Sequence, residues 1–138
     1  MRTDSTEQSR SCRGREGVPQ RVLVVDDEEH VRDFLTSILP SYGLEVTTCE
    51  NATEALLQPM LRDFYYIMID HDMPGMNGIN LTQRLRERLP FTVIIGMSGT
   101  DKSSDFLLAG ANEFLQKPFL PDDLAMMING PGSSDLNV

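Results

Sequence analysis

The chain has 138 residues, of which 40% are hydrophobic and 24% charged, a size and composition that fit one globular domain. Its formal net charge of -9 argues against direct nucleic-acid binding, because proteins of that class usually carry a basic surplus. No apolar run approaches the ~20 residues that a membrane helix needs, and the two cysteines, Cys12 and Cys49, form neither a disulfide framework nor a metal-binding spacing, so we expect a cytoplasmic protein without membrane contact.

Residues 1–20 are rich in Arg, Ser, Gly and Gln and carry almost no apolar side chains. This composition is typical of a disordered tail or linker, because such a segment cannot bury enough apolar surface to fold. The segment is also net basic, so the acidic excess of the chain belongs to the part that follows it.

From residue 21 onward, short apolar runs typical of buried strands alternate with stretches whose apolar residues recur at helical spacing. In chain order, the pattern predicts a strand at 22–25, a helix at 31–39, a strand at 44–49, a helix at about 53–61, a strand at 65–69, a helix at 79–89, a strand at 91–97, a helix at 103–109, a strand at 113–116 and a helix at 121–129. The second helix is expected to turn Met60 inward and to be kinked or shortened by Pro59. Gly130 and Pro131 are expected to end the last helix and to leave residues 130–138 as a flexible tail.

This alternation with short connections predicts one α/β domain over residues 21–129, with a parallel sheet covered by helices on both faces. In such open sheets, ligand sites lie beyond the carboxyl ends of the strands. Polar residues stand at those ends in this chain: Asp26, Asp27, Asp70, Ser98 and Lys117. We therefore expect these side chains to form one site at one edge of the sheet.

Three carboxylates at one sheet edge, those of Asp26, Asp27 and Asp70, need a cation or a proton beside them. Two unit charges ~4 Å apart repel by about 4 kcal/mol at an effective dielectric constant of about 20. A ligand set made only of oxygens suits a hard cation, and a site open to water and phosphate oxygens suits Mg²⁺. With Mg²⁺ neutralising the phosphoryl oxygens, one carboxylate could attack phosphorus while Ser98 and Lys117 contact the remaining oxygens. The sequence therefore favours a phosphoryl-accepting site.

Four segments that carry these residues resemble the receiver domain of bacterial two-component response regulators, and they come in the same order: VLVVDDEEHVR (22–32), IMIDHDMPGMNG (67–78), IIGMSGT (94–100) and GANEFLQKPF (110–119). The resemblance runs from about residue 22 to residue 129. It implies a flavodoxin-like, doubly wound sheet of five parallel strands in the order 2-1-3-4-5.

The resemblance also implies phosphorylation by a histidine kinase or phosphotransfer protein in a Mg²⁺-dependent reaction. Slow autodephosphorylation would follow, rather than enzymatic turnover. By this resemblance Asp70 is the phosphoacceptor, and Asp26 and Asp27 bind Mg²⁺ together with Asp70 and the backbone carbonyl of Asp72. The new group adds a charge of about -2 at neutral pH, which biases a two-state element.

The residues of that two-state element are also implied by the resemblance. Ser98 hydrogen-bonds the phosphoryl group and moves toward it, and Lys117 pairs with another phosphoryl oxygen. Phe114 is the switch aromatic that turns inward on activation and changes the surface of the fourth helix, fifth strand and fifth helix. The bond between Lys117 and Pro118 is commonly cis in this family.

The chain departs from the family pattern near the surface that such proteins use for output. Gly110 comes only 12 positions after Ser98, about one helical turn fewer than is usual, so a shortened fourth helix is expected. The fifth helix is also expected to end early. The output partner or fused effector stays unknown, and a homodimer stays open. Only eight residues, PGSSDLNV, follow Gly130 after the last expected helix, so we expect a stand-alone receiver or a piece of a longer regulator or hybrid kinase.

Other interpretations stay open at this point. Asp70 and Asp72 resemble the nucleophile and general acid of haloacid-dehalogenase-type phosphatases, although that family places its nucleophile on the first strand. A degenerate receiver could bind a protein partner without being phosphorylated. The acidic run at 26–29 could serve only to cap and charge the start of a helix. His30 and His71 are disfavoured as metal ligands or phosphorelay residues, because single histidines at a helix start or in a loop are usually solvated.

Overall fold

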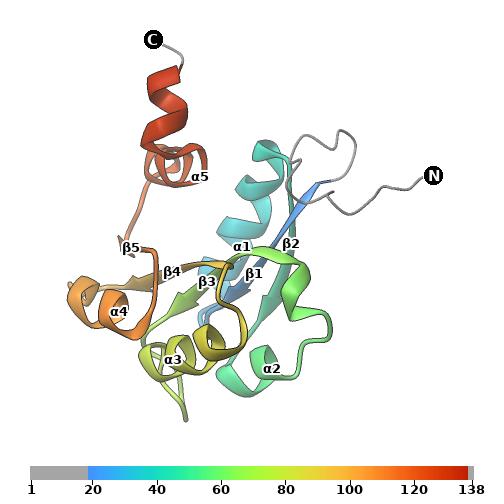
Figure 1. The fold of residues 1–138 in the computed structure, drawn as a ribbon, viewed down its shortest axis with the longest axis vertical. Coiled ribbons are helices and arrows are strands. Elements are labelled where there is room, and N and C mark those ends of the chain that lie inside the picture. The colour runs from blue at the N-terminus through green and yellow to red at the C-terminus, as the bar shows by residue number, and fades with distance from the viewer. Residues whose placement is uncertain (1–18, 137–138) are drawn as a thin grey trace.

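The computed structural model describes residues 19–136, with the side chains of residues 19–128, so the expected N-terminal tail lies almost entirely outside the described residues. The described part contains one sheet of five parallel strands in the order β2-β1-β3-β4-β5 (Figure 1). The strands are β1 (Gln20–Val25), β2 (Leu44–Cys49), β3 (Phe64–Asp70), β4 (Val93–Ser98) and β5 (Glu113–Gln116). The α/β class and the strand order expected from the sequence are confirmed.

Helices connect the strands and cover both faces of the sheet. They are α1 (Glu29–Ile38), α2 (Ala52–Leu56), α3 (Gly78–Arg88), α4 (Ser103–Ala109) and α5 (Pro121–Leu136), with short 3₁₀ helices η2 (Leu39–Tyr42) and η3 (Leu61–Asp63). Helices α1 and α5 pack on one face, and α2, α3 and α4 pack on the other (Figure 1). No helix in the described part of the chain is both long and apolar enough to cross a membrane.

Two apolar layers, one on each face of the sheet, form the core. Successive strand residues point to opposite faces, so a strand covered on both sides must be apolar at every position. The layer under α2, α3 and α4 contains Leu23, Ile67, Ile69, Ile94, Ala55, Leu85 and Phe106. The layer under α1 and α5 contains Val22, Val24, Met68, Ile95, Leu35 and Leu124. This double burial explains why the central strands read as unbroken apolar runs.

Helix α2 is shorter than the helix expected over 53–61. Asn51 caps its start, since the side-chain oxygen accepts a hydrogen bond of 2.9 Å from the backbone N–H of Glu54. The helix ends before Pro59, because that residue lacks an N–H and restricts the residue that precedes it. Met60 then adopts a left-handed conformation with φ of 59° and is 64% exposed. The expected inward placement of Met60 is therefore wrong.

The fourth strand also begins later than the pattern indicates. Pairing between β3 and β4 starts at Tyr66 and Val93, whereas Phe91 is 94% exposed. Phe91 lies in the connection from α3 to the strand and outside the paired residues, so its apolar character does not report burial.

Helix α5 runs to Leu136, so the expected end of the last helix at residues 129–131 is wrong, whereas the flexibility of residues 130–138 stays a prediction. Gly130 and Pro131 were expected to act as a stop signal, but a proline inside a helix removes one backbone hydrogen bond and can be accommodated by a bend. Helix α4 has seven residues, in line with the short spacing in the sequence. The domain limits at residues 21 and 129 stay predictions.

Candidate functional site

Three carboxylates meet at the carboxyl ends of β1 and β3. Asp26 follows β1, and Asp70 is the last residue of β3. Carboxylate oxygens of Asp26, Asp27 and Asp70 all lie within 4.8 Å of one another. Asp26 is 0% exposed and Asp70 is 2% exposed, whereas Asp27 faces solvent. The structure thus brings together the three acids that the sequence pattern places at one edge of the sheet.

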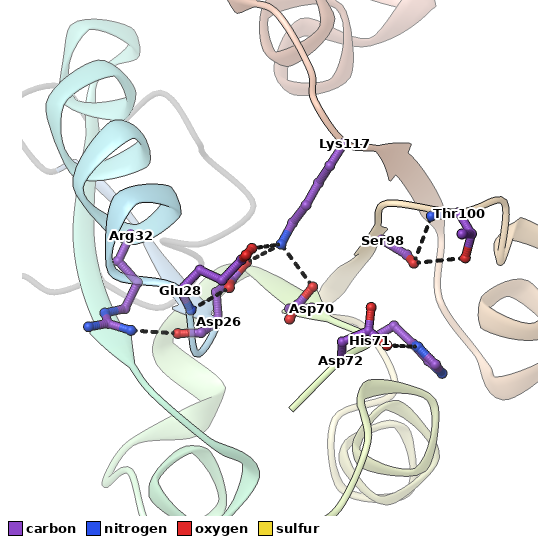
Figure 2. Close-up of polar contacts among 9 residues, drawn as sticks. All are labelled: Asp26, Glu28, Arg32, Asp70, His71, Asp72, Ser98, Thr100 and Lys117. Atoms are coloured by element: carbon purple, nitrogen blue, oxygen red, sulfur yellow. Dashed lines mark hydrogen bonds and ion pairs between the residues drawn. The ribbon is translucent and has the colours of Figure 1, made fainter. Parts of the chain in front are cut away.

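Asp26 is held in place by both its main chain and its side chain (Figure 2). Its N–H donates to the carbonyl of Cys49 (3.1 Å), which extends the pairing of β1 and β2 beyond the strand. Its carbonyl accepts from Nη1 of Arg32 (2.9 Å), and its Oδ1 accepts from the N–H of Glu28 (2.9 Å). Oδ1 of Asp26 therefore stabilises the start of α1, which is the role that the acidic run could have had alone. Its Oδ2 is left to take part in the cluster.

Lys117 extends from the end of β5 into the carboxylate cluster (Figure 2). Its Nζ lies 2.8 Å from Oδ2 of Asp26, 2.9 Å from Oδ1 of Asp70 and 3.0 Å from Oε1 of Glu28. The peptide bond between Lys117 and Pro118 is cis. Sequence reasoning gave Glu28 no role in the site, although its place in the acidic run after the first strand was an available signal.

Burial and crowding shift the pKa values of these groups. Burial raises the pKa of Asp70 to about 6, against the hydrogen bond from Lys117, and the charges of Asp26 and Asp27 add to the rise. Burial likewise raises the pKa of Asp26. Burial acts to lower the pKa of Lys117, but its hydrogen bonds to Asp26 and Asp70 outweigh this effect, and the pKa is raised. The ammonium therefore stays charged and only partly neutralises the cluster.

Removal of the Asp70 carboxylate is expected to stabilise the cation-free protein in a pH-dependent way. Because the pKa of about 6 lies above the ordinary value of 3.8, the folded protein keeps a proton that the unfolded chain loses. The contribution of Asp70 to stability therefore falls as pH rises from about 4 to about 6. The amide of Asp70→Asn does not titrate, so the variant does not lose stability in this pH range. Its free energy of unfolding should exceed that of the wild type by roughly 2–3 kcal/mol near pH 7.

Urea unfolding in EDTA at about pH 4 and about pH 7 measures this difference. Asp33→Asn is the matched control, because Asp33 is an exposed carboxylate on α1 outside the cluster. A pH-dependent advantage that appears in Asp70→Asn and not in Asp33→Asn is assigned to the cluster. An equal advantage of Asp70→Asn at both pH values would contradict the pKa assignment.

The start of α3 lies directly against the backbone of Asp70. The N–H of Gly78 donates to the carbonyl of His71 (3.1 Å), and the N–H of His71 donates to the carbonyl of Met97 on β4 (2.9 Å). A Cβ added at Gly78 would overlap the carbonyl oxygen of Asp70. The absence of a side chain at residue 78 therefore lets the chain return to the end of β3 and fixes the position of Asp70.

Ser98, the last residue of β4, lies on the other side of Asp70 from Asp26 (Figure 2). It is fully buried, and its Oγ accepts from the N–H of Thr100 (3.2 Å) and lies 3.4 Å from Oγ1 of that residue. The carbonyl of Ser98 accepts from the N–H of Lys117 (2.7 Å), which ties the ends of β4 and β5 together. Sequence reasoning gave Thr100 no role.

Phe114 and Asp72 are the remaining residues of the site expected from the sequence. Phe114 on β5 is half-buried, and its ring centre is 5.8 Å from that of Phe106. The side chain of Asp72 is 75% exposed, with Oδ1 2.9 Å from Nδ1 of His71, so its carboxylate turns away from the cluster. His71 is half-buried and its ring contacts that of Phe106 edge-on, so the expectation that it is solvated is wrong.

A groove of about 860 Å³ opens beside the cluster. It combines charged groups with the apolar side chains of Phe34 on α1 and Phe119 after β5, whose ring centres are 6.2 Å apart. The groove includes Asp70 and Lys117 in its wall. The otherwise buried cluster is therefore open to a small molecule or to a side chain of another protein.

The donor set fits a hard divalent cation. Within residues 19–128 the cluster is made of carboxylates alone, without Cys or His, and hard cations such as Mg²⁺ prefer oxygen ligands. Two of the carboxylates are buried beside a single ammonium, so additional positive charge would relieve their repulsion. The open groove leaves room for the water ligands that Mg²⁺ retains.

Comparisons with known proteins agree with this geometry. The family model described as "Response regulator receiver domain" matches residues 22–129. Protein PetR of Rhodobacter capsulatus is 34% identical over 113 residues, which cover 80% of this chain and 48% of PetR. The chain spans about half the length of the first curated relatives it matches.

Solved structures show the same fold. Chemotaxis protein CheY4 of Vibrio cholerae is 28% identical with a TM-score of 0.75, over 81% of this chain and 98% of that one. Response regulator TrrA of Thermotoga maritima, solved in complex with Mg(2+)-BeF, is 31% identical with a TM-score of 0.73, over 80% of this chain and 96% of that one. The family model, the strand order and these likenesses agree, and the chain belongs to the response regulator receiver domain family of two-component systems.

Proposed function

We propose that the chain accepts a phosphoryl group on Asp70 in a Mg²⁺-dependent reaction and changes conformation in response. The position of the Asp70 carboxylate carries this proposal. It is buried, its oxygens lie within 4.8 Å of those of Asp26 and Asp27, and it is 2.9 Å from the ammonium of Lys117. A nucleophile, a set of cation ligands and a fixed positive charge are the groups that phosphoryl transfer to a carboxylate requires.

Carboxylate oxygens of Asp26, Asp27 and Asp70, with the backbone carbonyl of Asp72, would hold the cation. Mg²⁺, when bound, neutralises phosphoryl oxygens and so favours attack by an anion. It would also lower the raised pKa of Asp70, because a nearby positive charge favours the ionised carboxylate. The reaction therefore depends on the cation in two ways: the cation keeps Asp70 ionised, and it neutralises the oxygens of the phosphoryl group that Asp70 attacks.

The transfer step forms one bond and breaks one. An oxygen of ionised Asp70 attacks phosphorus, and the bond from phosphorus to the donor atom breaks, with the electron pair leaving on the donor. Lys117 then pairs with a phosphoryl oxygen, and the hydroxyl of Ser98 donates to another. Water later hydrolyses the acyl phosphate slowly, so the chain is reset rather than acting as a turnover enzyme.

A phosphohistidine on a histidine kinase or phosphotransfer protein is the donor that family membership supports. The groove beside Asp70, with Phe34 and Phe119 in its wall, offers an apolar border that such a protein could contact. Movement of Ser98 toward the phosphoryl group, followed by inward rotation of Phe114, would carry the signal to the surface of α4, β5 and α5. This assignment fits a cytoplasmic signalling protein, whose output partner is a separate question.

Geometry disfavours the phosphatase alternative. A general acid must reach the leaving group, but the carboxylate of Asp72 is 75% exposed and paired with His71. A degenerate, purely binding receiver has no need for two buried acids around a half-buried lysine, which is an arrangement that is costly without a ligand.

Incubation of the wild-type chain with Mg²⁺ and a small phosphodonor such as acetyl phosphate tests the proposal. Intact-mass spectrometry should show the addition of one phosphoryl group, which is lost on mild base treatment because it is an acyl phosphate. EDTA should abolish the addition. Labelling that persists in EDTA would contradict the cation requirement, absence of labelling would favour a binding module, and multiple turnover of a phosphoester would favour a phosphatase.

A further inference from the structure

Phe106 on α4 connects the surroundings of Asp70 to Phe114. It has no exposed surface, and its ring centre lies 6.3 Å from that of His71, the residue after Asp70. The centre of the Phe114 ring on β5 is 5.8 Å away. One side chain of a helix thus contacts both the chain that follows β3 and the aromatic of β5.

The Phe106 ring rests on a glycine of β4. A Cβ added at Gly96 would overlap the carbon atoms of this ring, so the ring can lie there only because Gly96 has no side chain. Gly96 pairs in register with Phe114. Since side chains alternate along a strand, Gly96 and Ser98 lie on the same face of β4. Phe106, Phe114 and Ser98 therefore border one space over this strand.

We propose that Phe106 couples α4 to the phosphoacceptor site, because inward rotation of Phe114 displaces the Phe106 ring from Gly96 and moves α4 with it. The inference rests on the proposed function, in which Ser98 and Phe114 respond to phosphorylation. Protein interiors are packed as densely as organic crystals, so two rings cannot share the space over Gly96. Phe106 fills that space, and Phe114 is only half-buried beside it.

The size of α4 makes the displacement effective. The helix has seven residues, and Phe106 and Ala109 are its buried residues. A shift of its single large buried side chain therefore moves the helix as a body. Leu107 and Leu108 lie on its exposed side, so the movement changes the position of apolar groups at the surface. Phe106 acts in this scheme as a positioning residue, since it contacts neither the acceptor nor the cation ligands.

Amide spectra of three ¹⁵N-labelled full chains test the coupling: wild type, Phe106→Leu and Phe64→Leu. Phe64 is the matched control, because it is buried in the same apolar layer but lies at the opposite end of β3 from Asp70. Each spectrum is recorded with and without Mg²⁺ and beryllofluoride. The amides of Asp70 and His71 report on the site, and those of Leu107 and Leu108 report on α4.

In the wild type and in Phe64→Leu, both groups of amides are expected to shift on addition of Mg²⁺ and beryllofluoride. In Phe106→Leu the site amides should shift as before, whereas the α4 amides should lose most of their change. A purely structural role predicts equal behaviour of the two variants, because both lose the same atoms from the same layer. Phe114→Leu should also remove the α4 change, and the Phe106→Leu, Phe114→Leu double variant should show no further loss.

The outcomes separate the two proposals. A wild type whose site amides do not respond contradicts the phosphoacceptor function, and the coupling falls with it. Site amides that respond while the α4 amides stay still, or α4 amides that shift in Phe106→Leu as in the wild type, contradict the coupling alone. If Phe106→Leu does not fold, Phe106→Met keeps most of the volume without the rigid ring, and the same loss of the α4 shift is expected.

Discussion

Substitution of Asp70 by Asn is expected to reduce Mg²⁺-dependent phosphoryl incorporation to background. The amide keeps the shape of the carboxylate but has no negative oxygen to attack phosphorus. Asp26 and Asp27 remain in place, so two of the three carboxylate ligands of the cation are kept when the nucleophile is removed. Intact-mass spectrometry after incubation with acetyl phosphate measures the result, and circular dichroism checks that the fold is unchanged.

Asp33→Asn provides the control for this experiment, since it makes the same chemical change at an exposed position of α1. It should be labelled to the same extent as the wild type. Labelling that survives in Asp70→Asn would mean that another side chain is the acceptor, and peptide mapping of the labelled chain would identify it.

Substitution of Lys117 by Met is expected to destabilise the cation-free protein by about 3–5 kcal/mol near pH 7, because it leaves buried carboxylates without their partner. Lys117 contacts Asp26, Asp70 and Glu28 at 2.8, 2.9 and 3.0 Å, and Met retains much of its volume without the charge. Phosphoryl incorporation should fall by roughly 10²-fold or more, since a fixed charge that pairs with the transferred group is lost.

Two treatments should reduce the stability penalty of Lys117→Met. Mg²⁺ would restore positive charge to the cluster. Lower pH would protonate Asp26 and Asp70, whose pKa values rise further when the ammonium is removed, so the penalty should be smaller at about pH 5 than at about pH 7. Urea unfolding under these conditions measures both effects, with Lys102→Met, a change at the only other lysine, as control. A penalty that responds to neither treatment would contradict an electrostatic role.

The ends of the central strands can be predicted from the sequence, because a strand that is covered on both faces appears as an unbroken run of apolar residues. Asp26 and Asp70 each end an apolar run, Lys117 follows the strand at 113–116, and parallel strands end at a common edge. Side-chain pairing within that edge was harder to predict. Glu28 belongs to the same acidic run as Asp26, but its contact with Lys117 depends on how α1 begins, which apolar periodicity does not report.

Packing between elements accounts for the features that the sequence did not reveal. Phe91 and Met60 are apolar but exposed, because each lies in a connection rather than in an element with a buried face. The position of Phe106 on Gly96 depends on the approach of α4 to β4. A glycine in a strand and an aromatic in the next helix carry no pattern that links them, so this contact required the structure.

The close approach of α3 to Asp70 has a consequence for the tolerance of this domain to substitution. Since any Cβ at residue 78 would overlap the carbonyl oxygen of Asp70, a single change of Gly78 would shift the acceptor without altering one acidic or basic residue of the cluster. A chain with such a change would retain every chemical group that a survey of site residues looks for and still hold its nucleophile in the wrong place. The ability of Asp70 to accept a phosphoryl group therefore depends partly on the absence of a Cβ atom at residue 78.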